Sequence, residues 1–151
     1  MPERHRAQEL QVAERVRFLG VVPDTLPVLH AADAYLMPSS LEGFGIAAVE
    51  AMAAGAPVIL SDVPALNEFR GHVDTITWIQ PDARQLATAI AGLAATGPQQ
   101  RRALGQAGSE TVTRLFGVER GAGAYLSLYR QPWGGRRRGR GRASAQANTS
   151  M

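Results

Sequence analysis

The sequence predicts an α/β fold in which a mostly parallel sheet is flanked by helices. Short apolar segments alternate with longer segments of helical periodicity along the 151 residues, and this alternation is typical of right-handed strand–helix–strand units. One segment, Pro57 to Leu60, is apolar throughout, which fits a parallel strand covered on both faces. The length suits one domain with a substantial core.

Turn residues mark the ends of the expected elements. Gly20 closes the first strand and Pro38 stops the second, while Gly55 suits the C-terminal cap of a helix. Asp24 or Thr25 could cap another helix at its start. The expected strands are residues 16–19, 34–37, 57–60 and 74–79, and the longer helices are residues 1–13, 25–32, 45–54, 82–95, 98–115 and 117–129.

The composition changes near residue 134. Gly, Arg, Ser and Ala dominate from Gly134 onward, so residues 134–151 are predicted to be a disordered tail and residues 1–133 a partial domain. Five of the sixteen arginines lie in the tail, which leaves eleven against thirteen acidic residues in the remainder. The charge of the tail would attract nucleic acid or anionic membrane. Because only Trp133 accompanies the arginines, a solvated tail is the preferred interpretation, and nucleic acid is not the expected partner.

Several classes of protein are excluded by composition. No apolar run approaches the length that spans a bilayer, and residues 1–6 lack the apolar core of a signal peptide. The chain has no cysteine, so it forms neither disulfides nor thiolate metal sites. A cytoplasmic location is expected, and peripheral attachment at the inner face of the membrane stays open.

Two carboxylates lie eight residues apart around a glycine-rich turn into a helix. Residues 46–59 are apolar or small except for Glu50, so this helix is expected to be core-packed and Glu50 to need partners. Glu42 precedes the helix, and the glycines of turn 43–45 leave the backbone around Phe44 accessible to a ligand. Helix N-termini attract phosphate. The segment therefore predicts a site for polyhydroxyl and phosphate groups.

These residues resemble the signature of retaining GT-B glycosyltransferases of family 4, also called glycosyl transferases group 1, in which seven residues separate two glutamates. The resemblance covers roughly residues 12–129. Matching segments follow one another in the family's order: Arg17–Gly20, Ala31–Ser39, Glu42–Gly45, Glu50–Ala53, Gly55–Ile59 and Glu68.

The resemblance implies a Rossmann-like fold that is the incomplete C-terminal half of a GT-B enzyme, the half that binds the nucleotide sugar. In the family two further strands precede this region and carry cations that neutralise the diphosphate, and a separate N-terminal half completes the cleft. The chain is therefore expected to be truncated at its N-terminal side and to have little or no activity alone. The missing half could be in another chain, and an exposed sheet edge could lead to homo-oligomers.

The resemblance also implies roles for particular residues. Glu42 is the candidate catalytic residue, and it would position the transferred sugar rather than act as an established nucleophile. Glu50 would accept hydrogen bonds from the donor's ribose. The backbone of Gly43, Phe44 and Gly45 would bind the sugar or its diphosphate, and the backbone of Gly20, Val21 and Val22 would read the base. No metal or other cofactor is expected, because the sequence has no cluster of His and carboxylate residues and the resembled fold usually needs none. The nucleoside diphosphate sugar is the donor substrate.

Each of these residues also has a simpler interpretation. Glu50 could pair with an arginine, Glu42 could be solvated in its loop, and the glycines could only form a tight turn. Two other functions therefore stay open, a non-catalytic nucleotide-binding or regulatory module and a basic-tailed nucleic-acid interaction protein. The base, sugar and acceptor are not specified by the sequence.

Overall fold

The computed structural model describes residues 2–131, which fall into two units, residues 2–117 and residues 118–131. The first unit holds the sheet and its covering helices. In the second unit the described part is one helix, α6 (Val118–Arg130). The predicted tail, residues 134–151, lies outside the described residues.

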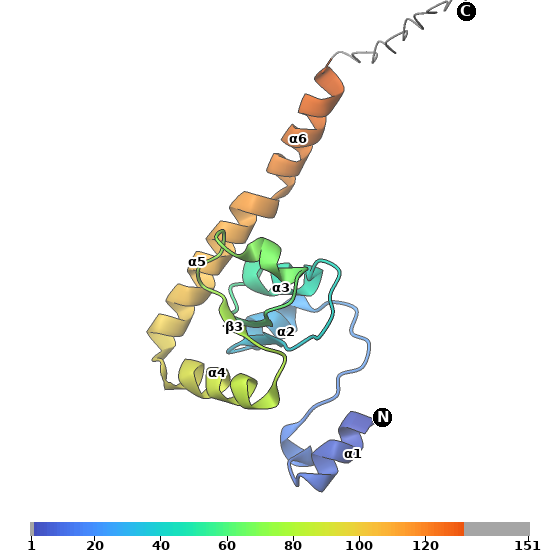
Figure 1. Cartoon of the computed structure of the whole chain (residues 1–151), viewed down its shortest axis with the longest axis vertical. Coiled ribbons are helices and arrows are strands. Elements are labelled where there is room, and N and C mark those ends of the chain that lie inside the picture. Colours follow the sequence, from blue (N-terminus) through green and yellow to red (C-terminus); the bar gives the residue numbers. More distant parts are fainter. Residues whose placement is uncertain (1, 132–151) are drawn as a thin grey trace, which may run out of the picture. The chain divides into compact units, whose positions relative to one another are not determined.

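The first unit is an α/β structure with three parallel strands in the order β1-β2-β3 (Figure 1). The α/β class and the parallel sheet predicted from the sequence are confirmed. Its strands are β1 (Tyr35–Met37), β2 (Val58–Ser61) and β3 (Thr77–Ile79). Its helices are α1 (Pro2–Glu9), η1 (Ala13–Arg15), α2 (Leu26–Ala31), α3 (Ile46–Ala53), η2 (Leu66–Phe69), α4 (Ala83–Ala95) and α5 (Pro98–Phe116). None of the helices among residues 2–131 is long and apolar enough to cross a membrane.

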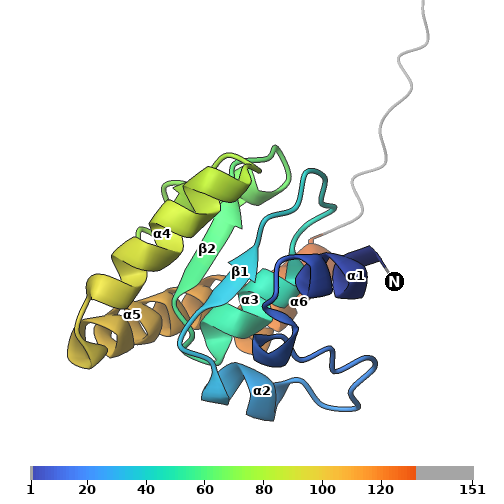
Figure 2. The same ribbon diagram turned by 90° about the horizontal axis from the view of Figure 1, so that it is seen from below.

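Strand β2 is buried along its whole length, as its apolar sequence predicted. Val58 and Leu60 point into the main core cluster with residues of α3. Ile59 points to the other face, where it lines a cavity with Ile90 of α4. Figure 2 shows α3 and α4 on opposite sides of β1 and β2. The core cluster consists of Met37, Ala48, Ala51, Met52, Ala56, Val58, Leu60, Val63, Leu66, Phe69, Val73, Ile76 and Val112.

The prediction of a strand at residues 16–19 is wrong. Val16 has an extended backbone, with φ −112° and ψ 123°, but the segment joins no ladder, and β1 pairs only with β2 in the described part of the chain. Leu19 is 56% exposed. The residues have strand character without a neighbouring strand to satisfy their backbone groups, and a sheet ladder requires that neighbour.

Helix boundaries follow the capping residues expected from the sequence. Asp82 accepts hydrogen bonds from the backbone N–H groups of Arg84 and Gln85, at 3.0 and 2.9 Å, and starts α4. Asp24 similarly accepts from the N–H of Leu26 at 2.9 Å, before α2. At the end of α3, Gly55 has φ 82°. Its left-handed conformation allows two hydrogen bonds that close the helix, Gly55 N–H to Met52 O at 2.9 Å and Ala56 N–H to Ala51 O at 3.0 Å.

Helices α3 and α5 approach each other closely at a second glycine. Gly105 of α5 is buried against the end of α3, and a Cβ at this position would lie 1.9 Å from the carbonyl oxygen of Gly55. Ser109, one turn later, donates a hydrogen bond from its Oγ to the carbonyl of Ala53 at 2.9 Å. The absence of a side chain at Gly105 therefore sets the distance between the two helices.

Gly105→Ala is expected to destabilise the protein by up to about 2 kcal/mol net, the upper overpacking cost less the gain in helix propensity. The substitution gains about 1 kcal/mol of helix propensity, but the new methyl group meets backbone atoms that cannot change rotamer, and overpacking of this kind costs about 1–3 kcal/mol or more. Chemical denaturation of both proteins measures the difference. The control is Gly92→Ala in α4, where a Cβ has no atom within 4 Å, and it should stabilise by about 0.5–1 kcal/mol. Equal effects of the two substitutions would contradict the close approach.

Candidate functional site

The loop between β1 and α3 carries the first candidate glutamate. Glu42 is half-buried, and the Oγ of Ser39 donates a hydrogen bond to its Oε1 at 2.7 Å. Ser39 thus fixes one oxygen of this carboxylate. The second oxygen stays available to accept from another donor.

The turn after Glu42 is anchored by aromatic packing. The ring of Phe44 meets Phe69 edge-to-face at 5.7 Å and Phe116 at 5.8 Å between centroids. Phe69 and Phe116 are themselves 5.9 Å apart, so the three rings form a closed cluster. The side chain of Phe44 therefore belongs to the packing of the turn, and any role in ligand binding falls to its backbone.

The two glycines of the turn differ in what they tolerate. Gly45 has φ 81° and ψ 43° and is the N-cap residue of α3. A Cβ on Gly45 would lie 2.5 Å from Cδ2 of Leu66, whereas a Cβ on Gly43 would have no atom within 4 Å. No side chain among the described residues caps this end of α3. Its first N–H groups therefore keep the partial positive charge of a helix N-terminus.

Helix α3 packs against the core as expected, but the expectation that Glu50 is buried in it and needs partners is wrong. Glu50 is exposed, and it takes part in none of the four ion pairs of the described residues. The buried side of α3 consists of Ala48, Ala51 and Met52, which follow helical spacing. Ala47 and Ala53 are exposed. Alanine fits either environment, so the run of small residues did not distinguish the buried face from the face that carries Glu50.

Glu50 lines an open cavity between α3 and the segment that begins α2. The cavity has a volume of about 530 Å³. Its other lining residues are Asp24, Thr25, Leu26, Leu29, His30, Ala53 and Ala54. A carboxylate, a hydroxyl and an imidazole thus surround one space of ligand size, since ligand pockets are roughly 300–1,000 Å³.

Tyr35 connects the two glutamates, and sequence reasoning missed it. Burial raises the pKa of the Tyr35 phenol above its usual value of 10.0, and the negative charges of Glu42 and then Glu50 raise it further. Both carboxylates therefore lie within electrostatic range of one phenol. Tyr35 packs against the core cluster on the α3 side, and the only signal in the sequence was a polar aromatic residue within an apolar strand.

The segment predicted to read the base is not part of this cavity. Gly20 has φ 67° and empty space around it. Val21 is fully exposed and Val22 is half-buried. Gly20, Val21 and Val22 do not line the space beside Glu50, and neither do Glu42 and residues 43–45. Glu42 and Glu50 are related instead through the charge that each exerts on Tyr35.

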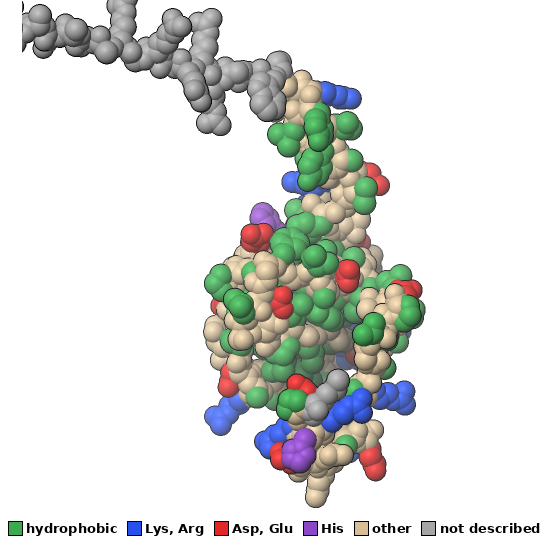
Figure 3. Space-filling view, turned by 90° about the vertical axis from the view of Figure 1, so that its right-hand side faces the viewer, with side chains coloured by type: hydrophobic (Ala, Val, Ile, Leu, Met, Phe, Trp, Pro, Cys, Tyr) green, Lys and Arg blue, Asp and Glu red, His purple; other side chains and the backbone are tan. Residues whose placement is uncertain are grey.

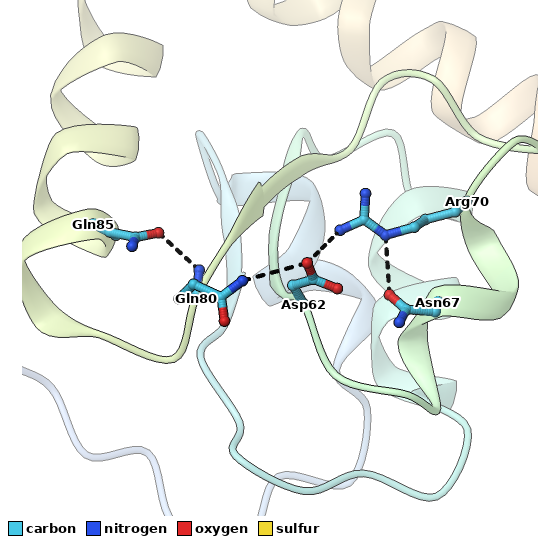
Figure 4. Close-up of polar contacts among 5 residues, drawn as sticks. All are labelled: Asp62, Asn67, Arg70, Gln80 and Gln85. Atoms are coloured by element: carbon cyan, nitrogen blue, oxygen red, sulfur yellow. Dashed lines mark hydrogen bonds and ion pairs between the residues drawn. The ribbon is translucent and has the colours of Figure 1, made fainter.

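A polar network joins the carboxyl ends of β2 and β3 (Figure 4). Asp62 Oδ2 accepts from Nη2 of Arg70 at 2.8 Å and from Nε2 of Gln80 at 3.4 Å. Nε of Arg70 donates to Oδ1 of Asn67 at 3.0 Å, and its guanidinium lies 4.3 Å from the ring centroid of Trp78. The network fixes the loop that carries η2. The sequence did not predict it, since these residues are separated along the chain and only the parallel strands bring them together.

The part of the chain that the structure describes contains no cluster of side chains suited to binding a metal ion. Among residues 2–131 no group of three or more His, Asp or Glu side chains is arranged to hold an ion. The polar groups available at the site are carboxylates, hydroxyls, one imidazole and backbone N–H groups.

Gly45→Ala is expected to destabilise the turn by about 2 kcal/mol or more, because a left-handed conformation costs a non-glycine residue about 1 kcal/mol or more and the methyl group also meets Leu66. Gly43→Ala, which meets nothing, should change the free energy of unfolding by less than about 0.5 kcal/mol. Thermal and urea unfolding of the two variants provide the comparison. If Gly45→Ala is as stable as Gly43→Ala, the turn is not packed as described.

Glu42→Gln is expected to lower the pKa of Tyr35 towards 10.0, since it removes one of the charges that oppose the phenolate. Tyr125→Phe and Tyr129→Phe leave Tyr35 as the single tyrosine, so the phenolate absorbance reports this residue alone. Because the folded-state pKa is raised, its stabilising contribution is present below pH 10 and is lost as pH rises through the folded pKa. If the pKa of Tyr35 is unchanged in Glu42→Gln, the charge of Glu42 does not act on the Tyr35 phenol.

Comparison with known proteins identifies the family of this chain. Residues 2–111 match the family model described as Glycosyl transferases group 1. A D-inositol 3-phosphate glycosyltransferase from Mycobacterium marinum is 37% identical over 139 residues, which cover 87% of this chain and 30% of that protein. A glycogen synthase from Mycobacterium tuberculosis is 34% identical over 128 residues, which cover 82% of this chain and 30% of that protein.

A solved structure gives the same result. A sucrose-phosphate synthase from Thermosynechococcus elongatus has a TM-score of 0.74 and 40% identity, with 86% of this chain and 34% of that chain covered. The chain thus spans about a third of the length of these relatives. The family match covers most of the chain and confirms the resemblance inferred from the glutamates and the segments around them. The chain belongs to the glycosyl transferases group 1 family.

Proposed function

We propose that this chain is the donor-binding half of a retaining glycosyltransferase that transfers a hexosyl group from a nucleoside diphosphate sugar to an acceptor. The observation that carries the proposal is the pair of carboxylates, Glu42 and Glu50, which both act on Tyr35 and lie on either side of the uncapped start of α3. The names of the relatives, which include glycosyltransferases and sugar polymer synthases, support this class of reaction.

Glu50 is proposed to bind the ribose of the donor. Its carboxylate lines a cavity of about 530 Å³ and pairs with no arginine of the described residues. A carboxylate offers two acceptor oxygens to the two neighbouring hydroxyls of a ribose. Asp24 lines the same cavity, and one of its carboxylate oxygens accepts from the N–H of Leu26 at 2.9 Å.

Glu42 is proposed to position the transferred sugar. Ser39 holds one of its oxygens, which leaves the other to accept a hydrogen bond from a sugar hydroxyl. The backbone of residues 43–45 and the start of α3 would receive the diphosphate. As the glycosidic bond breaks, negative charge grows on the leaving diphosphate, and N–H groups fixed at a helix N-terminus stabilise it without reorganisation.

The remaining parts of the enzyme are proposed to lie outside this arrangement. The backbone of Gly20, Val21 and Val22 would read the base, and a second half of the enzyme would supply the acceptor site and the rest of the cleft. We expect little or no transferase activity from the chain alone. Because β1 has a free edge among the described residues, self-association through that edge is also proposed.

The full chain is expected to bind UDP, GDP or ADP and their sugars with dissociation constants of roughly 0.1 mM or weaker, since each hydrogen bond contributes about 0.5–1.5 kcal/mol net. Titrations followed by amide NMR shifts, repeated at several protein concentrations to detect self-association, measure this. Glu50→Gln should weaken nucleotide and nucleotide sugar alike, by roughly tenfold, because hydrogen bonds to a charged group contribute about 1.5–3 kcal/mol. Glu42→Gln should weaken only the nucleotide sugar.

The matched control is Glu110→Gln on α5, whose carboxylate accepts from Gln106 Nε2 at 3.0 Å and is remote in sequence from the turn. It should leave every affinity unchanged. The parent chain should bind a 2′-deoxynucleoside diphosphate more weakly than the ribose form. The Glu50→Gln variant should bind the two forms equally well. Micromolar affinity would show a diphosphate-binding group that the proposal lacks, and a Glu50→Gln variant with unchanged ribose preference would refute the ribose assignment.

A further inference from the structure

A second polar cavity lies at the end of the sheet where the strands begin. It has a volume of about 270 Å³, and its lining includes Asp33, which precedes β1, and Pro57, which precedes β2. Figure 2 shows α2 and α5 at this end of β1 and β2. Glu42 and its turn follow the opposite, carboxyl end of β1, where ligands of open parallel sheets usually bind. The proposed donor reaction therefore does not account for this cavity.

Cationic side chains gather around this cavity. Helix α5 contributes Arg101 and Arg102, α2 contributes His30, and Asp33 is the single acidic residue among the described residues that line it. The first unit as a whole has the opposite balance, with nine arginines and twelve acidic residues in residues 2–117. Figure 3 shows a face on which red acidic side chains lie scattered among green apolar ones. The cavity thus concentrates positive charge on a unit that is acidic overall.

The fold uses only part of the guanidinium of Arg101. Its Nη1 donates to the carbonyl of Thr96, just after the end of α4. Its Nη2 lies 3.8 Å from Oδ1 of Asp33, which is longer than a hydrogen bond. The side chain of Asp33 is 91% exposed, whereas that of Arg101 is 21% exposed. Nη2 therefore keeps N–H donors that an anion in the cavity would engage.

Arg102 and His30 have no comparable structural task in the part of the chain that the structure describes. Both are exposed, and neither takes part in the ion pairs of residues 2–131. Holding the end of α4 explains Arg101 but explains neither of these two. A guanidinium presents its N–H donors as a planar fork, and an imidazole adds a further donor. The three side chains thus bring unused donors to one space.

The size and charge of the cavity indicate the class of anion. Its volume of about 270 Å³ lies just below the range of about 300–1,000 Å³ that is typical of ligand pockets. It therefore suits a phosphate group with a few carbon atoms rather than a whole nucleoside diphosphate sugar. A phosphate monoester carries about −1.5 to −2 charges and three acceptor oxygens at pH 7, and a carboxylate offers one charge and two oxygens. Two guanidinium groups match the phosphate better.

We propose that this cavity is a second anion site, which binds the phosphate group of a small phosphate monoester. The planar guanidinium of Arg102 and Nη2 of Arg101 donate to the phosphate oxygens, and His30 donates from the end of α2. Asp33 opposes the anion and limits its affinity. Because the cavity joins α2, the starts of β1 and β2, and α5, the bound anion also stabilises the first unit by mass action.

The test follows amide NMR shifts of the full chain during titration with inorganic phosphate and with glycerol 3-phosphate, at an ionic strength kept constant with sodium chloride. Both probes should give saturable shifts at Asp33, Gly55, Arg101 and Arg102, with dissociation constants of roughly 1 mM or tighter, because charge-assisted hydrogen bonds are stronger than neutral ones. Acetate should bind at least about tenfold more weakly, since it carries one charge and two acceptor oxygens.

Arg102→Gln should weaken both phosphate probes roughly tenfold, which corresponds to the loss of a charge-assisted hydrogen bond. Arg102 is the residue to change because Arg101 also contacts Thr96, so its loss would disturb the end of α4. The matched control is Arg114→Gln, which makes the same change of charge on the same helix at an exposed residue that does not line the cavity. It should leave the affinity for phosphate unchanged.

Asp33→Asn should have the opposite effect and tighten phosphate binding about twofold to fivefold, because it removes the one negative charge that faces the anion at an exposed position. A purely structural role of the arginines would not produce this gain. Since the side chain of Asp33 is almost fully exposed, the variant should fold like the parent chain, and far-ultraviolet circular dichroism checks this.

Four results would overturn the proposal. One is the absence of saturable shifts with either phosphate probe. Another is a set of shifts confined to residues 43–50, which would place the anion at the start of α3. Equal weakening by Arg102→Gln and Arg114→Gln would mean general attraction to positive charge. An affinity that Asp33→Asn leaves unchanged or lowers would mean that the anion does not bind beside this carboxylate.

Discussion

Helix α3 is held at both ends by glycine positions that admit no side chain, and the placement of both candidate glutamates depends on this. Gly45 lies under Leu66 at the start of the helix, and the carbonyl of Gly55 lies against Gly105 at its end. A rotation of α3 about its axis, or a shift along it, would break one of these contacts. Glu50 lies between Gly45 and Gly55, and Glu42 lies three residues before Gly45. The packing of the helix therefore determines the positions of both glutamates.

The aromatic cluster extends this constraint to other parts of the first unit. Phe69 comes from η2 and Phe116 from the end of α5, and both rings meet Phe44 in the turn. Each such pair contributes about 0.5–1.5 kcal/mol beyond its buried area. The loop of η2 is held from its other side by Arg70, which joins Asp62 and Trp78. A change in the polar network at the ends of β2 and β3 is therefore transmitted to the turn through Phe69.

The sequence predicted those elements whose formation depends on local physical chemistry. The buried strand β2, the Asp82 cap of α4 and the left-handed Gly55 all have causes within a few residues, and all are present. The strand expected at residues 16–19 was wrong, because a strand also requires a partner that lies elsewhere in the chain.

The candidate site was predicted in part, for a related reason. The motif located Glu42 and the turn, but not the exposure of Glu50, since alanine is compatible with both faces of a helix. Tyr35 and Ser39 were missed as neighbours of the glutamates. Both residues matter because they lie near the glutamates in three dimensions, and a tyrosine or a serine in the sequence does not by itself indicate such a neighbour. The family resemblance supplied roles for residues, and the structure adds which of them lie together.

The two faces of β1 have different surroundings. Tyr35 and Met37 point to the α3 side, where Tyr35 is in range of both carboxylates. Leu36 points the other way, is 38% exposed, and borders a cavity of about 240 Å³ with Ile59 and Ile90. A parallel strand is normally covered on both faces, so an apolar segment that covered Leu36 would bury surface that is now in water. Such a segment would lie on the face opposite the glutamates. This face could therefore be covered without closing the candidate donor site.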